Sequence, residues 1–202
     1  MGASCCKPNP NALLTAAKHG DCARVTALLQ GPHTAFVNFA GVRGDTALHL
    51  GASQGHADVV QALVGHGGDP RQLNDAGETA LHKACLNRHA KVVQLLLQHP
   101  KNPVDARRKV DGRSALMLAA SAGDASLVNL LLESKAYVNA ADARGLTALH
   151  LACASGSCDA VMALCEARAN CNSVSSEGKT AEDYAAGNKA VLAVLADWTE
   201  LS

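Results

Sequence analysis

The sequence predicts an all-α solenoid built from repeated pairs of helices. A nine-residue motif recurs five times, and the glycines that open its copies are 33, 35, 33 and 33 residues apart. These glycines are Gly44, Gly77, Gly112, Gly145 and Gly178. A fixed period of this length is typical of stacked repeats, because one helix pair can bury its apolar face only against its neighbours. Aromatic residues make up only 2% of the 202 residues, which favours thin helices packed through small side chains. The 35-residue interval predicts two extra residues near 100–103, in a bulged turn.

Each repeat is expected to form two helices and a loop, as its first full copy illustrates. Thr46 is expected to cap the first helix by accepting a hydrogen bond from the amide of His49, and Gln54-Gly55 is expected to end that helix. A second helix is expected through residues 59–64, where apolar residues follow the i, i+1, i+4, i+5 spacing of an amphipathic helix. His66 and the two glycines after it end this helix, and a polar, hairpin-like loop leads to the next copy.

Both ends of the repeat array have the features of caps. A helix pair is expected within residues 11–29, before the first full motif. In the last copy Glu182-Asp183 replaces the usual Leu-His, and a closing helix is expected over residues 191–198. A terminal repeat turns one face to water, so polar residues are expected there. The chain is therefore predicted to have a flexible tail, residues 1–10, and one repeat domain, residues 11–202. That domain comprises an N-terminal cap pair, four full repeats and a C-terminal cap pair.

The repeated motif resembles the signature of the ankyrin-repeat family. Its fullest copy reads Gly145-Leu-Thr-Ala-Leu-His-Leu-Ala-Cys153, and the resemblance extends from about residue 11 to the C-terminus. It implies a solenoid of helix-turn-helix pairs joined by β-hairpin-like loops. It also implies a non-catalytic protein–protein interaction module, expected here as a monomer.

The resemblance places partner contacts on the hairpin tips and on the exposed concave face of the first helices. Leu86 and Leu146 are expected to be exposed apolar anchors, with charged residues around them setting the register and the association rate. The expected contact residues are Arg43, Asp45, Asp75, Glu78, Leu86, Asn87, Arg108, Lys109, Arg113, Ser121, Arg144 and Leu146.

The distribution of charge suggests which kind of partner would bind. The formal net charge is zero, which gives the whole molecule no electrostatic bias toward nucleic acid. Residues 71–113, however, contain nine Lys/Arg and four Asp/Glu, a net charge of +5. This excess predicts a partner with an acidic surface, and a merely solvated face is the alternative. Nucleic acid is disfavoured because no aromatic stacking platform accompanies the charge.

Residues that could carry chemistry have structural explanations, and no catalytic residue, cofactor or metal is expected. His49, His82 and His150 recur at one register, but Met117 fills the same position in the third copy, which a set of metal ligands would not tolerate. In the resembled family this histidine ties the start of the helix to the neighbouring turn. Gly178-Lys-Thr lacks the first glycine and the preceding strand of a phosphate-binding loop.

The eight cysteines show neither a CxxC pair nor zinc-like spacing. Cys85 and Cys153 stand where other copies of the motif have alanine, so they are expected to be inert packing thiols. This usage favours a reducing, intracellular environment.

The N-terminal residues suggest a lipid anchor. The sequence Met-Gly-Ala-Ser-Cys-Cys-Lys offers Gly2 for myristoylation and Cys5 and Cys6 for palmitoylation. Cys6 departs from the usual motif, which prefers Ser or Thr at the sixth position. We therefore expect an adaptor tethered to the cytoplasmic face of a membrane. The alternative is a soluble, ankyrin-type stoichiometric inhibitor of an enzyme or a transcription factor.

Overall fold

The computed structural model describes residues 9–30, 36–185 and 187–199. The chain forms two compact units, Met1–Asn102 (unit 1) and Pro103–Ser202 (unit 2). The described part of unit 1 contains α1 (Pro10–His19), α2 (Cys22–Leu29), the 3-10 turn η2 (Val42–Gly44), α3 (Ala47–Gln54), α4 (Ala57–Gly65), α5 (Ala80–Leu86) and α6 (Ala90–Leu97). Unit 2 contains α7 (Ala115–Ser121), α8 (Ala125–Glu133), α9 (Ala148–Ser155), α10 (Cys158–Glu166), α11 (Ala181–Tyr184) and α12 (Lys189–Thr199). The all-α class and the six helix pairs are confirmed for the described residues.

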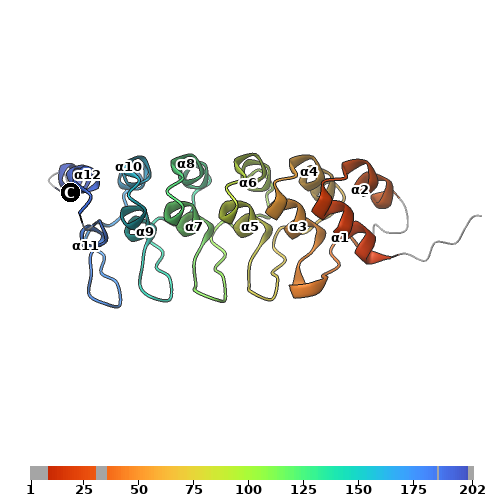
Figure 1. Ribbon diagram of the computed structural model, residues 1–202, viewed down its shortest axis with the longest axis horizontal. Coiled ribbons are helices and arrows are strands. Elements are labelled where there is room, and N and C mark those ends of the chain that lie inside the picture. Colours follow the sequence, from red (N-terminus) through yellow and green to blue (C-terminus); the bar gives the residue numbers. More distant parts are fainter. Residues whose placement is uncertain (1–8, 31–35, 186, 200–202) are drawn as a thin grey trace, which may run out of the picture. The chain divides into compact units, whose positions relative to one another are not determined.

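Within each unit the helices form two layers (Figure 1). In unit 1, α1, α3 and α5 pack side by side, and α2, α4 and α6 form the second layer, which lies above them in the view of Figure 1. Unit 2 repeats this arrangement, with α7, α9 and α11 in the lower layer and α8, α10 and α12 in the upper layer. Long loops extend from the first layer. The core lies between the layers and consists mostly of Ala, Val and Leu, as the low aromatic content predicts.

The recurring Thr and His cap the N-terminal ends of α3, α5 and α9, as predicted for Thr46. The His49 amide lies 3.4 Å from the Thr46 hydroxyl, and the Thr46 amide donates to His49 Nδ1 over 3.2 Å. The other ring nitrogen, Nε2, lies 2.9 Å from the carbonyl of Glu78 in the next repeat. Because Nδ1 accepts the amide hydrogen, Nε2 carries the proton and donates to that carbonyl. His49 is therefore a buried structural link between repeats, and so is His150, whose Nε2 lies 3.3 Å from the Lys179 carbonyl.

Acid is expected to destabilise this arrangement. Burial lowers the pKa of His49 and His150 below the ordinary value, although hydrogen bonds to the Glu78 and Lys179 carbonyls oppose this effect. The unfolded chain therefore binds these protons more readily than the folded chain. Both histidines contribute their full stabilisation above about pH 6.5 and lose it as the pH falls below that value. Urea melts over a pH series would measure this slope.

A matched pair of variants isolates the histidine contribution to this slope. His150→Met copies the natural Met117 of the neighbouring repeat, so it should flatten the acid limb of stability even if it lowers stability at neutral pH. Met117→Leu alters the same register of the neighbouring repeat without a titratable group and should leave the slope unchanged. An equally steep slope in His150→Met would contradict this assignment.

The extra residues predicted near 100–103 form a wide turn after α6. The Asn102 amide donates to the His99 carbonyl over 3.0 Å, and Asn102 Nδ2 donates to the Leu96 carbonyl over 2.6 Å. The corresponding turns after α8 and α10 are closed by the backbone amides of Ala136 and Ala169 instead. The side chain of Asn102 thus satisfies a helix-end carbonyl that a shorter turn satisfies with its own backbone.

Candidate functional site

The loops between successive helix pairs recur at equivalent positions in both units and extend away from the first layer of helices (Figure 1). We call residues 40–45, 73–78, 107–113, 141–146 and 174–179 the finger loops. Each is a tight turn closed by its own backbone. In loop 141–146 the Asp142 amide donates to the Leu146 carbonyl over 2.9 Å. Gly145 has a left-handed φ of 73°, and a Cβ there would lie 3.0 Å from the Ser176 amide nitrogen, so glycine is required.

Hydrogen bonds between neighbouring fingers hold their tips in register. In unit 1 the Asp75 amide donates to the Arg43 carbonyl over 3.0 Å. In unit 2 the Ala143 amide donates to Asp111 over 3.0 Å, and the Ser176 amide donates to the Arg144 carbonyl over 2.9 Å. Side chains at the tips are thus presented from a fixed backbone, which lowers the conformational cost of binding a partner.

Seven of the predicted contact residues are exposed. In unit 1 these are Arg43, Asp75, Leu86 and Asn87, and in unit 2 they are Lys109, Ser121 and Arg144. Leu86, at the end of α5, is therefore exposed as predicted. Three others, Asp45, Arg108 and Arg113, are only partly exposed because they take part in ion pairs.

Two predicted contact residues are buried. Leu146 is only 2% exposed, so the expectation that it forms an exposed anchor is wrong. Its amide and carbonyl both bond to Asp142 across the turn, and this pairing holds the residue at the base of the finger rather than at the tip. Glu78, at the equivalent position of loop 73–78, is also buried.

A half-buried charge network lies behind the tips of unit 1. Lys83 Nζ is 2.9 Å from Glu78 Oε2 and 3.8 Å from Asp45 Oδ1. Asn74 Nδ2 donates to Asp45 Oδ1 over 2.8 Å, and Asn74 Oδ1 accepts from the Glu78 amide over 2.9 Å. Glu78 thus stabilises the fingers instead of facing a partner.

A second network supports the fingers of unit 2. Arg108 forms an ion pair with Asp111, and Arg113 Nε lies 3.2 Å from Asp142 Oδ2. Burial raises the pKa of the Asp111 carboxyl, but hydrogen bonds from Arg108 and Arg113 outweigh this effect and hold that pKa below its usual value. Two of the cations that produce the predicted basic excess are therefore neutralised within the protein.

The predicted contact set leaves out several exposed finger residues, among them Val42, Val110 and Arg107. Val42 is 88% exposed, Val110 is 74% exposed, and Arg107 is also exposed. Each lies within two residues of a predicted contact, Arg43 or Lys109. For Val42 and Val110 the signal in the sequence is an apolar residue in the middle of a polar turn. Such a residue is exposed because a loop tip has no neighbouring side chains that could bury it.

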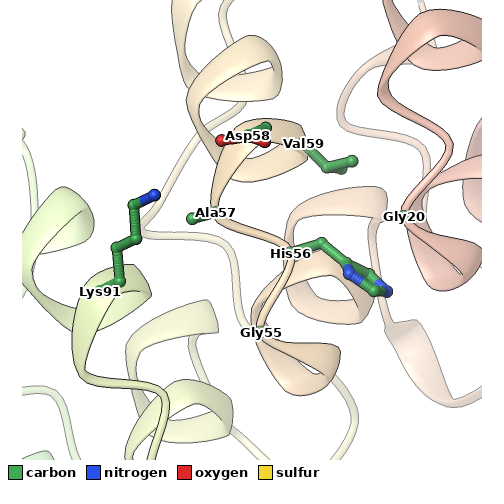
Figure 2. A pocket seen from close by; sticks show the side chains of 7 residues that line it. All are labelled: Gly20, Gly55, His56, Ala57, Asp58, Val59 and Lys91. Carbon is green, nitrogen blue, oxygen red and sulfur yellow. The ribbon is translucent and has the colours of Figure 1, made fainter.

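A cavity of about 280 Å³ lies at the start of α4 (Figure 2). His56 points toward Gly20, and its Nε2 is 3.2 Å from the Lys18 carbonyl, while Lys91 enters from α6. The cavity is lined by Gly20, Gly55, His56, Ala57, Asp58, Val59 and Lys91. His56 links neighbouring repeats here, and we assign no ligand to this cavity.

The thiols that sequence analysis expected to be inert are buried. Cys85 and Cys153 lie in the core, and burial raises the pKa of Cys153 to about 12. Burial also raises the pKa of Cys165 to about 12. Among the described residues, no cluster of three or more His, Cys, Asp or Glu side chains could hold a metal ion.

The predicted acylation residues Gly2, Cys5 and Cys6 lie outside the described residues. Within the described part of the chain, none of the helices has both the length and the apolar character needed to cross a membrane.

Comparison with known proteins agrees with the repeat architecture. The sequence matches the family described as "Ankyrin repeats (3 copies)" over residues 2–74, 52–142 and 116–200. The fold is similar to that of EF0377, a protein whose crystal structure is described as that of an ankyrin repeat protein. The TM-score is 0.86 and the sequence identity 27%, over 93% of this chain and 98% of that chain. None of the curated proteins matches the chain. The chain therefore belongs to the ankyrin repeat family, whose repeats are protein–protein interaction modules.

Proposed function

We propose that this protein is a non-catalytic adaptor that holds a protein partner at the cytoplasmic face of a membrane. The observation that carries the proposal is the set of fingers in each unit, whose backbones are bonded to one another within that unit while exposed side chains project from their tips. Arg43 and Asp75 in unit 1 and Lys109 and Arg144 in unit 2 are the most direct candidates for contact. Leu86, Asn87 and Ser121 extend these surfaces onto the first helices.

The groups with potential for chemistry support a binding role rather than catalysis. His49 and His150 use both ring nitrogens to close and link repeats. Cys153 and Cys165 have pKa values raised to about 12 by burial, so both remain thiols at neutral pH, whereas nucleophilic cysteines act as thiolates. These residues stabilise the scaffold on which partner contacts are displayed.

The membrane tether rests on the N-terminal sequence and requires Met1 to be the translated start. One myristoyl chain gives only marginal membrane association, on the order of 10⁴ M⁻¹, so a stable anchor needs a second signal. Cys5 and Cys6 would supply that signal by palmitoylation. α1 begins at Pro10, and a tail of this length spans roughly 30 Å when extended at about 3.3 Å per residue. The anchor would therefore hold α1 close to the bilayer.

Gly2→Ala is expected to release the protein to the cytosol, because myristoylation creates the transient membrane contact at which palmitoylation occurs. Cys5→Ser combined with Cys6→Ser should leave a weak, exchanging membrane pool. Membrane fractionation and acyl-chain labelling of a C-terminally tagged protein in cells would measure both effects. Pro8→Ala, which alters the tail outside the acylation residues, is the control and should remain on membranes.

A wild-type protein that is entirely cytosolic would refute the anchor, as would membrane binding that survives Gly2→Ala. The soluble stoichiometric inhibitor would then become the preferred function, since it uses the same finger surface without a tether.

A further inference from the structure

The finger loops of the two units carry opposite charge. Loops 107–113 and 141–146 in unit 2 together contain five Lys/Arg and two Asp, a net charge of +3. Loops 40–45 and 73–78 in unit 1 contain one Arg and three Asp/Glu, a net charge of −2. A partner that recognises charge therefore meets a different surface on each unit, and the cationic one belongs to unit 2.

The cations of unit 2 divide into two groups by their environment. Arg108 and Arg113 are half-buried and bound to Asp111 and Asp142, so they hold the loops together. Arg107 and Lys109 are exposed, and no carboxylate of the described residues lies within ion-pair distance of either side chain. The side chain of Arg107 is positioned by its Nε, which donates to the Gly112 carbonyl over 2.9 Å.

The neighbouring finger adds a third exposed cation. Arg144 is 59% exposed in its side chain and lies 3.3 Å from Glu177, which is itself largely exposed. An exposed pair of this kind contributes little to stability, so Arg144 can exchange Glu177 for a carboxylate of a partner. The bond between the Ala143 amide and the Asp111 carbonyl fixes the two fingers relative to each other.

An exposed apolar side chain lies next to these cations. Val110 directly follows Lys109 at the tip of the finger and is 74% exposed. Covering this side chain removes apolar surface from water, which favours association. Charge and apolar surface thus occur together at one tip.

We propose that Arg107, Lys109, Val110 and Arg144 form a docking site for an acidic peptide segment that carries at least one apolar side chain. The proposal rests on the protein-binding function proposed above and names the partner chemistry of the unit 2 surface. Guanidinium groups bind carboxylates through paired hydrogen bonds, which favours Asp- or Glu-rich sequences. Asp111 and Asp142 lie in the same two fingers, and Glu177 lies in the next finger, loop 174–179. These carboxylates disfavour a continuous phosphate backbone. The finger loops also contain no aromatic side chain on which bases could stack.

The test is a selection of random displayed peptides against the full chain, followed by anisotropy titrations with the selected peptides in synthetic, fluorescent form. The selected peptides are expected to be enriched in Asp and Glu around a large apolar residue. Arg107→Glu combined with Lys109→Glu should weaken their binding at least about tenfold at low salt. The loss should shrink at high salt, because the Debye length falls from about 10 Å at 0.1 M to about 3 Å at 1 M. Lys91→Glu combined with Lys101→Glu makes the same change of charge on exposed residues of unit 1 and should leave binding unchanged.

A second pair of variants tests the apolar anchor. Val110→Ser should weaken binding severalfold, whereas Val174→Ser, at an exposed valine of another finger, should not. Melting curves of the variants should coincide with that of the wild type, because the altered side chains are exposed.

Several outcomes would overturn this inference. One is a selection that yields no acidic peptides. Another is a set of acidic peptides that bind the Arg107→Glu, Lys109→Glu variant as tightly as they bind the wild type. A third is a single-stranded oligonucleotide that displaces every selected peptide. Peptides that lose binding only with Arg43→Glu or Leu86→Ser would overturn the docking site but leave the protein-binding function standing. Failure of every selected peptide to bind the wild-type chain would count against both.

Discussion

Replacing Leu48 with alanine is expected to lower the free energy of unfolding by about 2–5 kcal/mol, the cost of deleting a large buried aliphatic side chain. The same change at Leu13 is expected to cost less. Both side chains are fully buried, so the difference arises from their neighbours. α3, which carries Leu48, packs against α1, α4 and α5, whereas α1 packs against α2 and α3. The cavity left by Leu48→Ala therefore disturbs three helix–helix interfaces of α3, whereas the cavity left by Leu13→Ala disturbs two of α1.

Urea melts followed by circular dichroism would compare the two variants with the wild type. Val42→Ala is the control, since this side chain is almost fully exposed and its loss should change stability by no more than about 0.5 kcal/mol. Equal losses at Leu48 and Leu13, or a larger loss at Leu13, would contradict the assignment of the first helix pair as a cap.

The helices could be predicted from sequence because their signals are local. Thr46 and Thr79 each accept a hydrogen bond from the amide three residues later, as the motif predicts. Gly55 ends α3 with a left-handed φ of 79°, a conformation that glycine adopts at little cost. At the start of α11 Asp183 takes the place of the histidine and accepts from the Thr180 amide over 2.8 Å. Each of these contacts joins residues close in the chain.

The candidate site could be predicted only in part, because exposure at a finger depends on contacts between repeats. Arg113 was expected to face a partner, but it pairs with Asp142, which is 29 residues away in the sequence. Leu146 follows the hairpin glycine just as the exposed Lys179 does, yet it is buried. Loop 174–179 packs against loop 141–146 on one side, through the bond from Ser176 to Arg144. The side chains of Leu146 and Lys179 differ in polarity, and the apolar Leu146 is the buried one.

The carboxylate of Asp142 is the least exposed charged group in the unit 2 fingers, at 1% exposure. Its Oδ1 accepts from the amides of Arg144, over 2.8 Å, and Leu146, over 2.9 Å. Its Oδ2 accepts from Arg113 Nε over 3.2 Å. One side chain thus closes its own turn and anchors the neighbouring finger. Its removal would leave two amides without their acceptor and would leave Arg113 with Asp111, 3.5 Å away, as its ion-pair partner.

Asp142→Ala is therefore expected to destabilise the protein by about 3 kcal/mol, at the lower end of the cost of breaking a buried ion pair, because Arg113 is partly exposed and can regain water. Asp142→Asn should cost much less, about 1 kcal/mol, because an amide oxygen can still accept from both backbone amides. Asn74 already makes one of the two equivalent bonds in loop 73–78, where its Oδ1 accepts from the Glu78 amide over 2.9 Å. Urea melts of the two variants, combined with Arg113→Ala in a double-mutant cycle, would separate the turn from the ion pair. If Asp142→Asn and Arg113→Ala each lower the free energy of unfolding only slightly, most of the stability lost in Asp142→Ala comes from the two backbone amides of the turn. An Asp142→Asn variant as unstable as Asp142→Ala would show instead that the charge, and not the turn, holds the fingers of unit 2 together.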